Sequence, residues 1–124
     1  MTRYPGLTLR ILGNGSAAMG PGKAELITRI NTTGSISAAA REMGMSYRRA
    51  WQLVEAINKS FREPVVVTAT GGKRGGGASV TDFGRALVAQ FHAMEDKASS
   101  AIADDLAHYA QQLRAKSVRR KSSS

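Results

Sequence analysis

The sequence predicts a mostly α fold with a small β wing, a winged helix-turn-helix followed by a long C-terminal dimerisation helix. Three observations predict this fold class. Two helical segments within residues 36–61 are joined by a short turn that contains a glycine, and a β-branched segment at residues 65–70 leads into a glycine-rich basic loop. Apolar residues then recur every three or four positions over residues 83–113, which is the spacing of one helix face.

The first expected elements are a strand and a helix. Residues 7–12 largely alternate apolar and polar side chains, which predicts a short strand that ends at residues 13–15, Gly-Asn-Gly. A helix is expected to start at about Lys23. It is expected to end at Gly34, because a glycine accepts the left-handed conformation that often follows the last turn of a helix.

Two further helices predict the helix-turn-helix itself. Either Ser35 or Ser37 can cap a short helix over residues 38–43, and Gly44 permits the sharp turn that follows. A third helix is expected from residue 47 to about residue 61, with its apolar and polar side chains on opposite faces. The apolar arc holds Tyr47, Ala50, Trp51, Leu53, Val54, Ile57 and Phe61. We expect this arc, the tryptophan included, to face the core.

The segment after the third helix predicts a β-hairpin. Residues 65–70 are rich in β-branched side chains and read as a strand. Residues 71–77 contain five glycines and form a loop, and residues 78–80 can return as the second strand. Lys73 and Arg74 are expected at the tip of this wing, where glycines on both sides let the backbone approach a phosphate or a minor groove.

Thr81 is expected to cap a long helix that pairs two copies of the chain. Its apolar stripe is longer than one small domain can cover, so a helix left alone would expose a patch that favours association. The predicted dimerisation residues are Phe83, Leu87, Phe91, Met94, Ile102, Leu106, Tyr109 and Leu113. The alternative is a helix that folds back onto its own domain and leaves the chain monomeric.

Length and composition limit the classes of function. The chain has 124 residues, of which 42% are hydrophobic and 22% charged, and it contains no cysteine. We expect a winged helix-turn-helix domain over residues 1–80, the dimerisation helix over 81–113 and a basic disordered tail over 114–124. Neither a secretory signal nor an apolar run of the roughly 18 residues that a membrane span needs is recognised, so a cytoplasmic protein is expected.

The charge is strongly basic and unevenly distributed. Eighteen lysines and arginines against nine acidic residues give a formal net charge of +9. The excess lies in residues 1–85, with 12 basic and five acidic residues, whereas residues 86–113 hold one basic and four acidic residues. A basic front part predicts a polyanionic partner, and a merely solvated basic surface is the alternative.

Double-stranded DNA is the partner that the motifs favour. Arginine and glutamine on the third helix have the donor geometry for guanine and adenine edges, and serine or tyrosine at a helix N-terminus can bind phosphate. The predicted DNA-contacting residues are Ser35, Ser46, Tyr47, Arg48, Arg49, Gln52, Lys73 and Arg74. The alternatives are an ordinary polar helix face and a flexible loop with incidental charges.

No catalytic or metal site is predicted. The pairs His92/Asp96 and Asp104/His108 are each four residues apart on the long helix. Each pair provides only two groups, and exposed pairs with this spacing are common on helices. The sequence offers no nucleophile with a matching base. We therefore expect no enzyme activity, no metal and no cofactor.

Several of these segments resemble a known family. Residues 34–40, the segment Met45–Trp51 and the glycine-rich residues 69–78 resemble the N-terminal DNA-binding domain of molybdate-responsive transcriptional regulators of the ModE type, which has a LysR-like winged helix-turn-helix. The resemblance covers about residues 7–98. It implies a homodimeric regulator that binds a palindromic operator and dimerises through its N-terminal segment and the long helix.

The same resemblance bears on molybdate. Full-length regulators of this type carry a separate C-terminal β-rich domain that binds molybdate or tungstate, whereas this sequence shows a helix and a basic tail. The expected function is therefore sequence-specific transcriptional regulation related to molybdenum or oxyanion homeostasis, with molybdate binding by this chain doubtful. The alternative function is a small molybdate- or oxyanion-binding homeostasis protein without DNA regulation.

Overall fold

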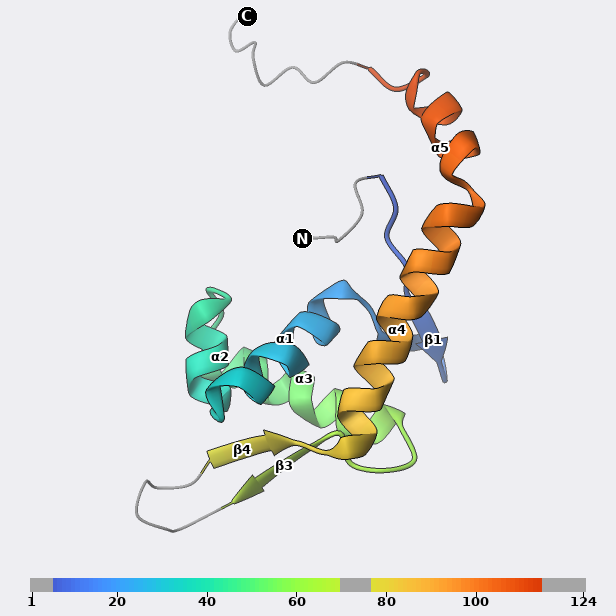
Figure 1. Ribbon diagram of the computed structural model, residues 1–124. Helices are drawn as coiled ribbons and strands as arrows, with labels where there is room; N and C mark the ends of the chain where they lie inside the picture. The colour runs from blue at the N-terminus through green and yellow to red at the C-terminus, as the bar shows by residue number, and fades with distance from the viewer. Residues whose placement is uncertain (1–5, 70–76, 115–124) are drawn as a thin grey trace, which may run out of the picture.

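The computed structural model describes residues 6–69 and 77–114 and is mostly helical (Figure 1). The described elements are β1 Ile11–Gly13, β2 Ser16–Met19, α1 Pro21–Thr33, α2 Ile36–Glu42, α3 Tyr47–Ser60, β3 Val66–Ala69, β4 Gly77–Val80, α4 Asp82–Ala101 and α5 Ala103–Ala110. The strands form two antiparallel hairpins, β1–β2 and β3–β4. A mostly α fold with small β elements is thereby confirmed.

The N-terminal strand belongs to a hairpin that the sequence pattern did not predict. In place of a single strand over residues 7–12, β1 pairs with β2, and Leu12 lies opposite Ala17. The chain reverses at Gly15, whose φ of 89° is in the left-handed region that glycine adopts without steric cost. The preceding asparagine makes this an Asn-Gly turn, the strongest short-range signal for a hairpin.

Helix α1 lies at the centre of the core, in contact with α2, α3, α4 and β4. It begins at Pro21, two residues before the expected start, because the fixed φ of proline suits the first turn of a helix. It ends as expected at Gly34, whose φ is 73° and whose N–H donates to the carbonyl of Ile30 at 2.8 Å. The largest fully buried side chains are Phe91, Leu26, Ile27, Ile30, Ile57, Val54 and Val65.

Helices α2 and α3 are packed together and joined by a four-residue turn, residues 43–46. Ser35 caps α2 by accepting a hydrogen bond from the N–H of Ala38 at 3.0 Å, and α2 therefore begins two residues earlier than expected. Gly44 has a φ of 70°, which the sharp turn requires. Ala40 is only 2% exposed, and its small side chain lets the two helices approach closely.

The second hairpin, β3–β4, lies close to the expected positions. Val66 is opposite Val80, and the pairing is regular over four residues on each strand. The hairpin is tied to the end of α1, because the N–H of Ala78 donates to the carbonyl of Gly34 at 3.0 Å. The connecting residues 70–76 lie outside the described residues.

Where the sequence predicts one helix over residues 81–113, the structure has two. Thr81 caps α4 through its side chain, as predicted, with a hydrogen bond of 2.9 Å. Helices α4 and α5 are separated by Ile102, whose φ of −115° and ψ of 18° depart from helical values. Two aspartates occupy the first turn of α5, where negative charge stabilises a new helix N-terminus. Neither glycine nor proline marks this break.

The described ends of the chain lie near α5. A Cβ placed on Gly6 would stand 3.5 Å from the side chain of Leu106, so the start of the described chain lies against this helix. Arg114 is exposed at the other end, and residues 115–124 of the expected basic tail are outside the described residues. None of the described helices is both long and apolar enough to cross a membrane.

Candidate nucleic-acid interface

Helix α3 separates an apolar face from a polar and cationic face. Ala50, Val54 and Ile57 are at most 1% exposed and face the core. The opposite face exposes Arg48, Arg49, Gln52, Glu55 and Lys59. Both arginines and the glutamine lie in the first two turns of the helix, directly after the tight turn. The surface therefore presents the side chains whose donors match nucleobase edges.

Tyr47 differs from the expected buried arc, whereas Trp51 faces the core as expected. Tyr47, at the first position of α3, is 49% exposed. Trp51 is half-buried and packs against the core cluster. The tyrosine is thus available at the surface beside Arg48, and the tryptophan has mainly a packing role.

Two serine hydroxyls in the predicted DNA-contacting set are engaged with the backbone. Ser46 caps α3 by accepting a hydrogen bond from the N–H of Arg49 at 3.0 Å, and Ser35 caps α2 in the same way. A hydroxyl that accepts such a bond keeps its own proton, so it can still donate to an anionic oxygen. Ser46 is exposed and Ser35 is half-buried.

Within the described ranges, the ion pairs lie away from the exposed face of α3. Arg29 of α1 pairs with Glu25 at 2.6 Å and with Glu42 of α2 at 3.0 Å. The hydrogen bonds that Arg29 donates to these two carboxylates, with Glu25 the larger cause, raise the pKa of Arg29 above its ordinary value. Neither Arg48 nor Arg49 takes part in an ion pair with another described residue, so both charges remain available to an external partner.

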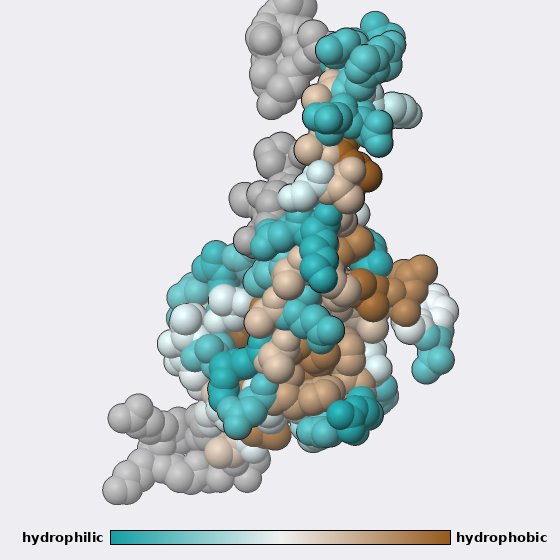
Figure 2. All heavy atoms as spheres, turned by 45° about the vertical axis from the view of Figure 1, so that its right-hand side comes forward, coloured by the Kyte–Doolittle hydropathy of each residue, from teal (hydrophilic) through white to brown (hydrophobic). Residues whose placement is uncertain are grey.

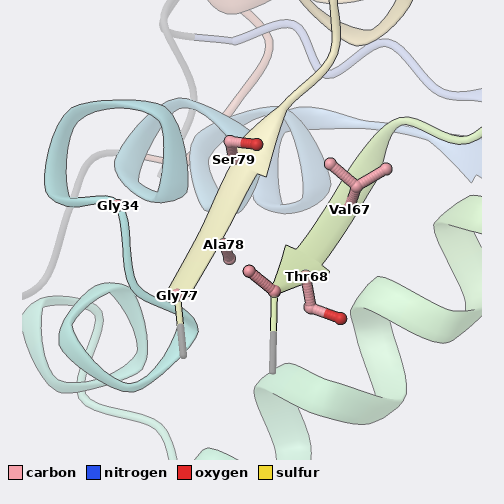
Figure 3. A pocket seen from close by; sticks show the side chains of 7 residues that line it. Gly34, Val67, Thr68, Gly77, Ala78 and Ser79 are labelled. Carbon is pink, nitrogen blue, oxygen red and sulfur yellow. The ribbon is translucent and has the colours of Figure 1, made fainter. Parts of the chain in front are cut away.

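An open groove lies along hairpin β3–β4 beside the turn between α1 and α2 (Figure 3). Its lining residues are Gly34, Val67, Thr68, Ala69, Gly77, Ala78 and Ser79. The side chains are small, and the hydroxyl-bearing Thr68 and Ser79 are exposed. Lys73 and Arg74, predicted at the tip of this hairpin, lie outside the described residues.

Asn58 connects α3 to the hairpin, a role that the sequence analysis did not predict. Its Nδ2 donates to the carbonyl of Val66 at 2.9 Å. Its Oδ1 accepts from the N–H groups of Val65 at 2.8 Å and Val66 at 3.1 Å. The signal in the sequence is an asparagine inside a helix, a position where this residue is disfavoured unless its side chain has another partner.

The predicted dimerisation residues divide into a buried and an exposed group. Phe91 is 1% exposed, and Phe83 and Leu87 also pack against the core cluster of their own chain. The exposed members are Met94, Ile102, Tyr109 and Leu113, and Leu106 is half-buried. Leu12 of hairpin β1–β2 is 73% exposed, and Figure 2 shows apolar side chains gathered beside α4 on this side of the molecule. Phe91 is therefore a core residue rather than a surface contact.

The histidine pair on α4 differs from the one considered in the sequence. Nδ1 of His92 lies 2.9 Å from a carboxylate oxygen of Glu95, three residues further along α4. Glu95 is 3% exposed, which makes it a deeply buried acidic residue on this helix. In the part of the chain that the structure describes, no group of three or more His, Asp or Glu side chains could hold a metal ion.

The fold and this face define a small helical domain with two antiparallel hairpins that exposes a cationic helix surface.

Several bacterial proteins are similar to this chain in sequence, and three of them are described here. The molybdenum-pterin-binding protein MopB of Rhodobacter capsulatus is 48% identical over 85 residues, which are 68% of this chain and 32% of MopB. The molybdenum transport protein ModE of Azotobacter vinelandii is 38% identical over 85 residues, 68% of this chain and 32% of that protein. The DNA-binding transcriptional dual regulator ModE of Escherichia coli strain K12 is 35% identical over 88 residues, 68% of this chain and 34% of that protein.

Over the matched residues, this chain is similar to the ModE and Mop proteins, and this similarity supports a relationship to the ModE family. The chain spans about a third of the length of these relatives. No protein-family model matches the chain.

Proposed function

We propose that this chain is a sequence-specific DNA-binding transcriptional regulator with a winged helix-turn-helix fold, and that it binds a palindromic operator as a homodimer. Helix α3 enters the major groove, and hairpin β3–β4 is the wing. The residues proposed to contact DNA are Ser35, Ser46, Tyr47, Arg48, Arg49, Gln52, Lys73 and Arg74. In this proposal the protein acts in the cytoplasm, without enzyme activity or a cofactor, in molybdenum or oxyanion homeostasis.

The observation that carries this proposal is the exposed cationic face at the start of α3. Arg48, Arg49 and Gln52 stand at the surface within the first two turns of a 14-residue helix. The major groove of B-DNA is about 12 Å wide and admits a helix, whose N-terminal residues then reach the base edges. Helix α2 packs against α3 on its opposite side and leaves this face open.

The relatives support both the regulation of transcription and the link to molybdenum. The matched protein of Escherichia coli is named a DNA-binding transcriptional regulator, and that of Azotobacter vinelandii a molybdenum transport protein. Because the matches cover only about a third of each relative, these names enter here as proposals for this chain.

The exposed apolar residues in α5 and just beyond its end support a homodimer. Tyr109 and Leu113 are 68% and 64% exposed, and apolar side chains at this exposure are stabilised when a second copy covers them. A two-fold pair of chains would set two α3 helices about 34 Å apart, or a multiple of this distance, which matches a palindromic operator. The acidic residues between 95 and 105 suit a dimer contact that faces away from phosphates.

A molybdate- or oxyanion-binding protein without DNA regulation is the second candidate, favoured by the name of the MopB relative. Equilibrium dialysis of the chain against molybdate distinguishes the two. Retention of about one anion per chain or per dimer, combined with no affinity for duplex DNA, would support the second candidate. DNA binding without retention of molybdate would support the first.

Fluorescence anisotropy with labelled duplexes of mixed sequence tests DNA binding directly. We expect binding at about 50 mM salt that weakens steeply toward 200 mM, because each neutralised phosphate releases a counterion. Arg48→Gln and Arg49→Gln should each bind more weakly than Arg114→Gln, a charge-matched control at the exposed end of the described chain. Absence of binding by the wild type at low salt would contradict the proposed function.

A further inference from the structure

The root of hairpin β3–β4, residues Val65 and Val66, is held by hydrogen bonds with the side chain of Asn58. The N–H of Thr81 donates to the carbonyl of Val65 at 2.9 Å. Residues along an antiparallel strand alternate in whether they bond to the partner strand, so Val66, the first residue of β3, turns its N–H and C=O away from β4. Asn58 bonds to both of these groups, with its Oδ1 3.1 Å from the N–H and its Nδ2 2.9 Å from the carbonyl oxygen. One side chain of α3 thus replaces a neighbouring strand at this edge.

Helix α4 fixes the same root from the other side. The hydroxyl of Thr81 donates to the carbonyl of Pro64 at 2.8 Å. Gly84 lies so close that a Cβ there would stand 2.7 Å from the carbonyl oxygen of Val65. Val65 and Val66 are 0% and 3% exposed. Because α3 and α4 hold these two residues from both sides, the hairpin cannot turn relative to α3 without breaking the hydrogen bonds of Asn58.

Asn58 is distinct from the face of α3 that is proposed to contact DNA. It is half-buried and lies ten residues after Arg48, at the far end of the helix. Both its amide oxygen and its amide nitrogen are occupied by the backbone of residues 65 and 66. Its influence on a nucleic acid would therefore act through the position of the hairpin.

We propose that Asn58 is a positioning residue that sets the orientation of hairpin β3–β4 relative to α3, and so sets how the hairpin meets the phosphate backbone while α3 occupies the major groove. This inference rests on the proposed DNA-binding function. It assigns sequence preference to the exposed face of α3 and assigns part of the general affinity to the hydrogen bonds of Asn58.

The variant Asn58→Ala tests the effect on DNA. Affinity for the preferred duplex and for mixed-sequence duplex should fall by the same factor, and the plot of log affinity against log salt should become shallower by about one unit, as when one phosphate contact is lost. The preference ratio between the two duplexes should stay unchanged. Ile57→Val, which removes one buried methyl group next to Asn58, is the control for lost stability and should leave the salt slope unchanged.

A measurement without DNA tests the geometry. Amide hydrogen exchange at Val65 and Val66 should be at least about tenfold faster in Asn58→Ala than in the wild type, because these N–H groups lose their acceptor. The amide of Arg49, which donates a hydrogen bond to the hydroxyl of Ser46, should exchange at the same rate in the wild type and in Asn58→Ala. Asn58→Asp keeps the acceptor oxygen and loses the donor to Val66, so its effect should be intermediate, and it provides the test if Asn58→Ala does not fold. Ser60→Asp, on the exposed end of α3, is the control that introduces the same negative charge as Asn58→Asp.

The outcomes separate this inference from the function on which it rests. If the wild type binds no duplex while Val65 and Val66 lose protection in Asn58→Ala, the proposed function fails, and the role in DNA binding fails with it. If the wild type binds and Asn58→Ala keeps the wild-type salt slope, or changes the preference between duplexes, the positioning role is overturned. Unchanged exchange at both amides would overturn it as well.

Discussion

Gly84 of α4 lies against the backbone of Val65, at a distance that leaves no room for a side chain. A Cβ on Gly84 would stand 2.7 Å from the Val65 carbonyl oxygen and 2.8 Å from Cγ1 of Val65. It would also stand 2.9 Å from Cγ1 of Val80. Helix α4 therefore meets the backbone of Val65, directly before β3, and the side chain of Val80 in β4 at a distance that a glycine permits.

Replacement of this glycine should destabilise the fold. Alanine normally stabilises a helix interior relative to glycine by about 1 kcal/mol, but Gly84→Ala should lower the free energy of unfolding by about 1–3 kcal/mol because it overpacks the contact with Val65. Gly22→Ala is the control, since a Cβ at Gly22 meets nothing within 4 Å. Urea denaturation measures both. A Gly84→Ala variant as stable as Gly22→Ala would contradict the close approach.

Trp51 should contribute less to stability than Phe91. Phe91 is 1% exposed, and Phe91→Ala should cost about 3–5 kcal/mol through the cavity that it leaves. Trp51 is half-buried, so Trp51→Ala should cost about 2–3 kcal/mol, below the fully buried case. Thermal denaturation of the two variants shows which of them loses more stability. If Trp51→Ala melts like the wild type and loses only DNA binding, the tryptophan is a contact residue instead.

Sequence preference should reside on α3. Arg48→Ala or Gln52→Ala should cost about 1–3 kcal/mol on the preferred duplex and little on mixed-sequence DNA, because a lost base contact affects only the matching sequence. Competition binding measures the two affinities, with Arg114→Ala as the control for a lost exposed charge. Equal losses on both duplexes would show that these side chains contact phosphates and that another surface determines the preference.

General affinity should depend on Lys73 of the predicted wing. Lys73→Ala should weaken binding to preferred and mixed-sequence duplexes equally and reduce the salt slope by about one unit. Titrations at several salt concentrations give the slope. A loss restricted to the preferred duplex would assign Lys73 to base recognition.

Two exposed apolar residues, Tyr109 of α5 and Leu113 just beyond its end, should mediate self-association. A Tyr109→Asp/Leu113→Asp double variant should dissociate into chains of 13.2 kDa, because two buried charges would oppose the contact. Leu106→Asp is less informative, since Leu106 also lies against Gly6 of its own chain. Sedimentation velocity measures the mass of wild type and variant. A wild type that sediments as a monomer at every accessible concentration would end the dimer proposal.

Much of the fold was predictable because its signals are local. The cap at Thr81, the glycine that ends α1 and the glycine in the α2–α3 turn each follow from residues within four positions of the boundary. The apolar face of α3 follows from the 3.6-residue period. The β1–β2 hairpin was not predicted, although Asn14-Gly15 indicates such a turn, because the small residues of β2 lack the β-branched pattern of a strand.

The remaining features depend on packing between distant segments, which a single sequence does not show. The stripe on α4 and α5 predicts one apolar face, but the domain core covers its first half and buries Phe91. The break at Ile102 has no glycine or proline to mark it. Asn58 acts on backbone groups seven and eight residues further along the chain, so its role became visible only once the hairpin was placed.

The most direct test of the central claim is a selection of bound fragments from random duplex DNA by the wild-type chain, followed by sequencing. A homodimer that reads the major groove with α3 predicts enrichment of an inverted repeat, with half-site centres about 10–10.5 base pairs or a multiple of this apart. The enrichment should be lost with Arg48→Ala/Gln52→Ala and kept with Arg114→Ala. Recovery of unenriched sequence by the wild type, at a salt concentration where it still binds, would contradict sequence-specific recognition.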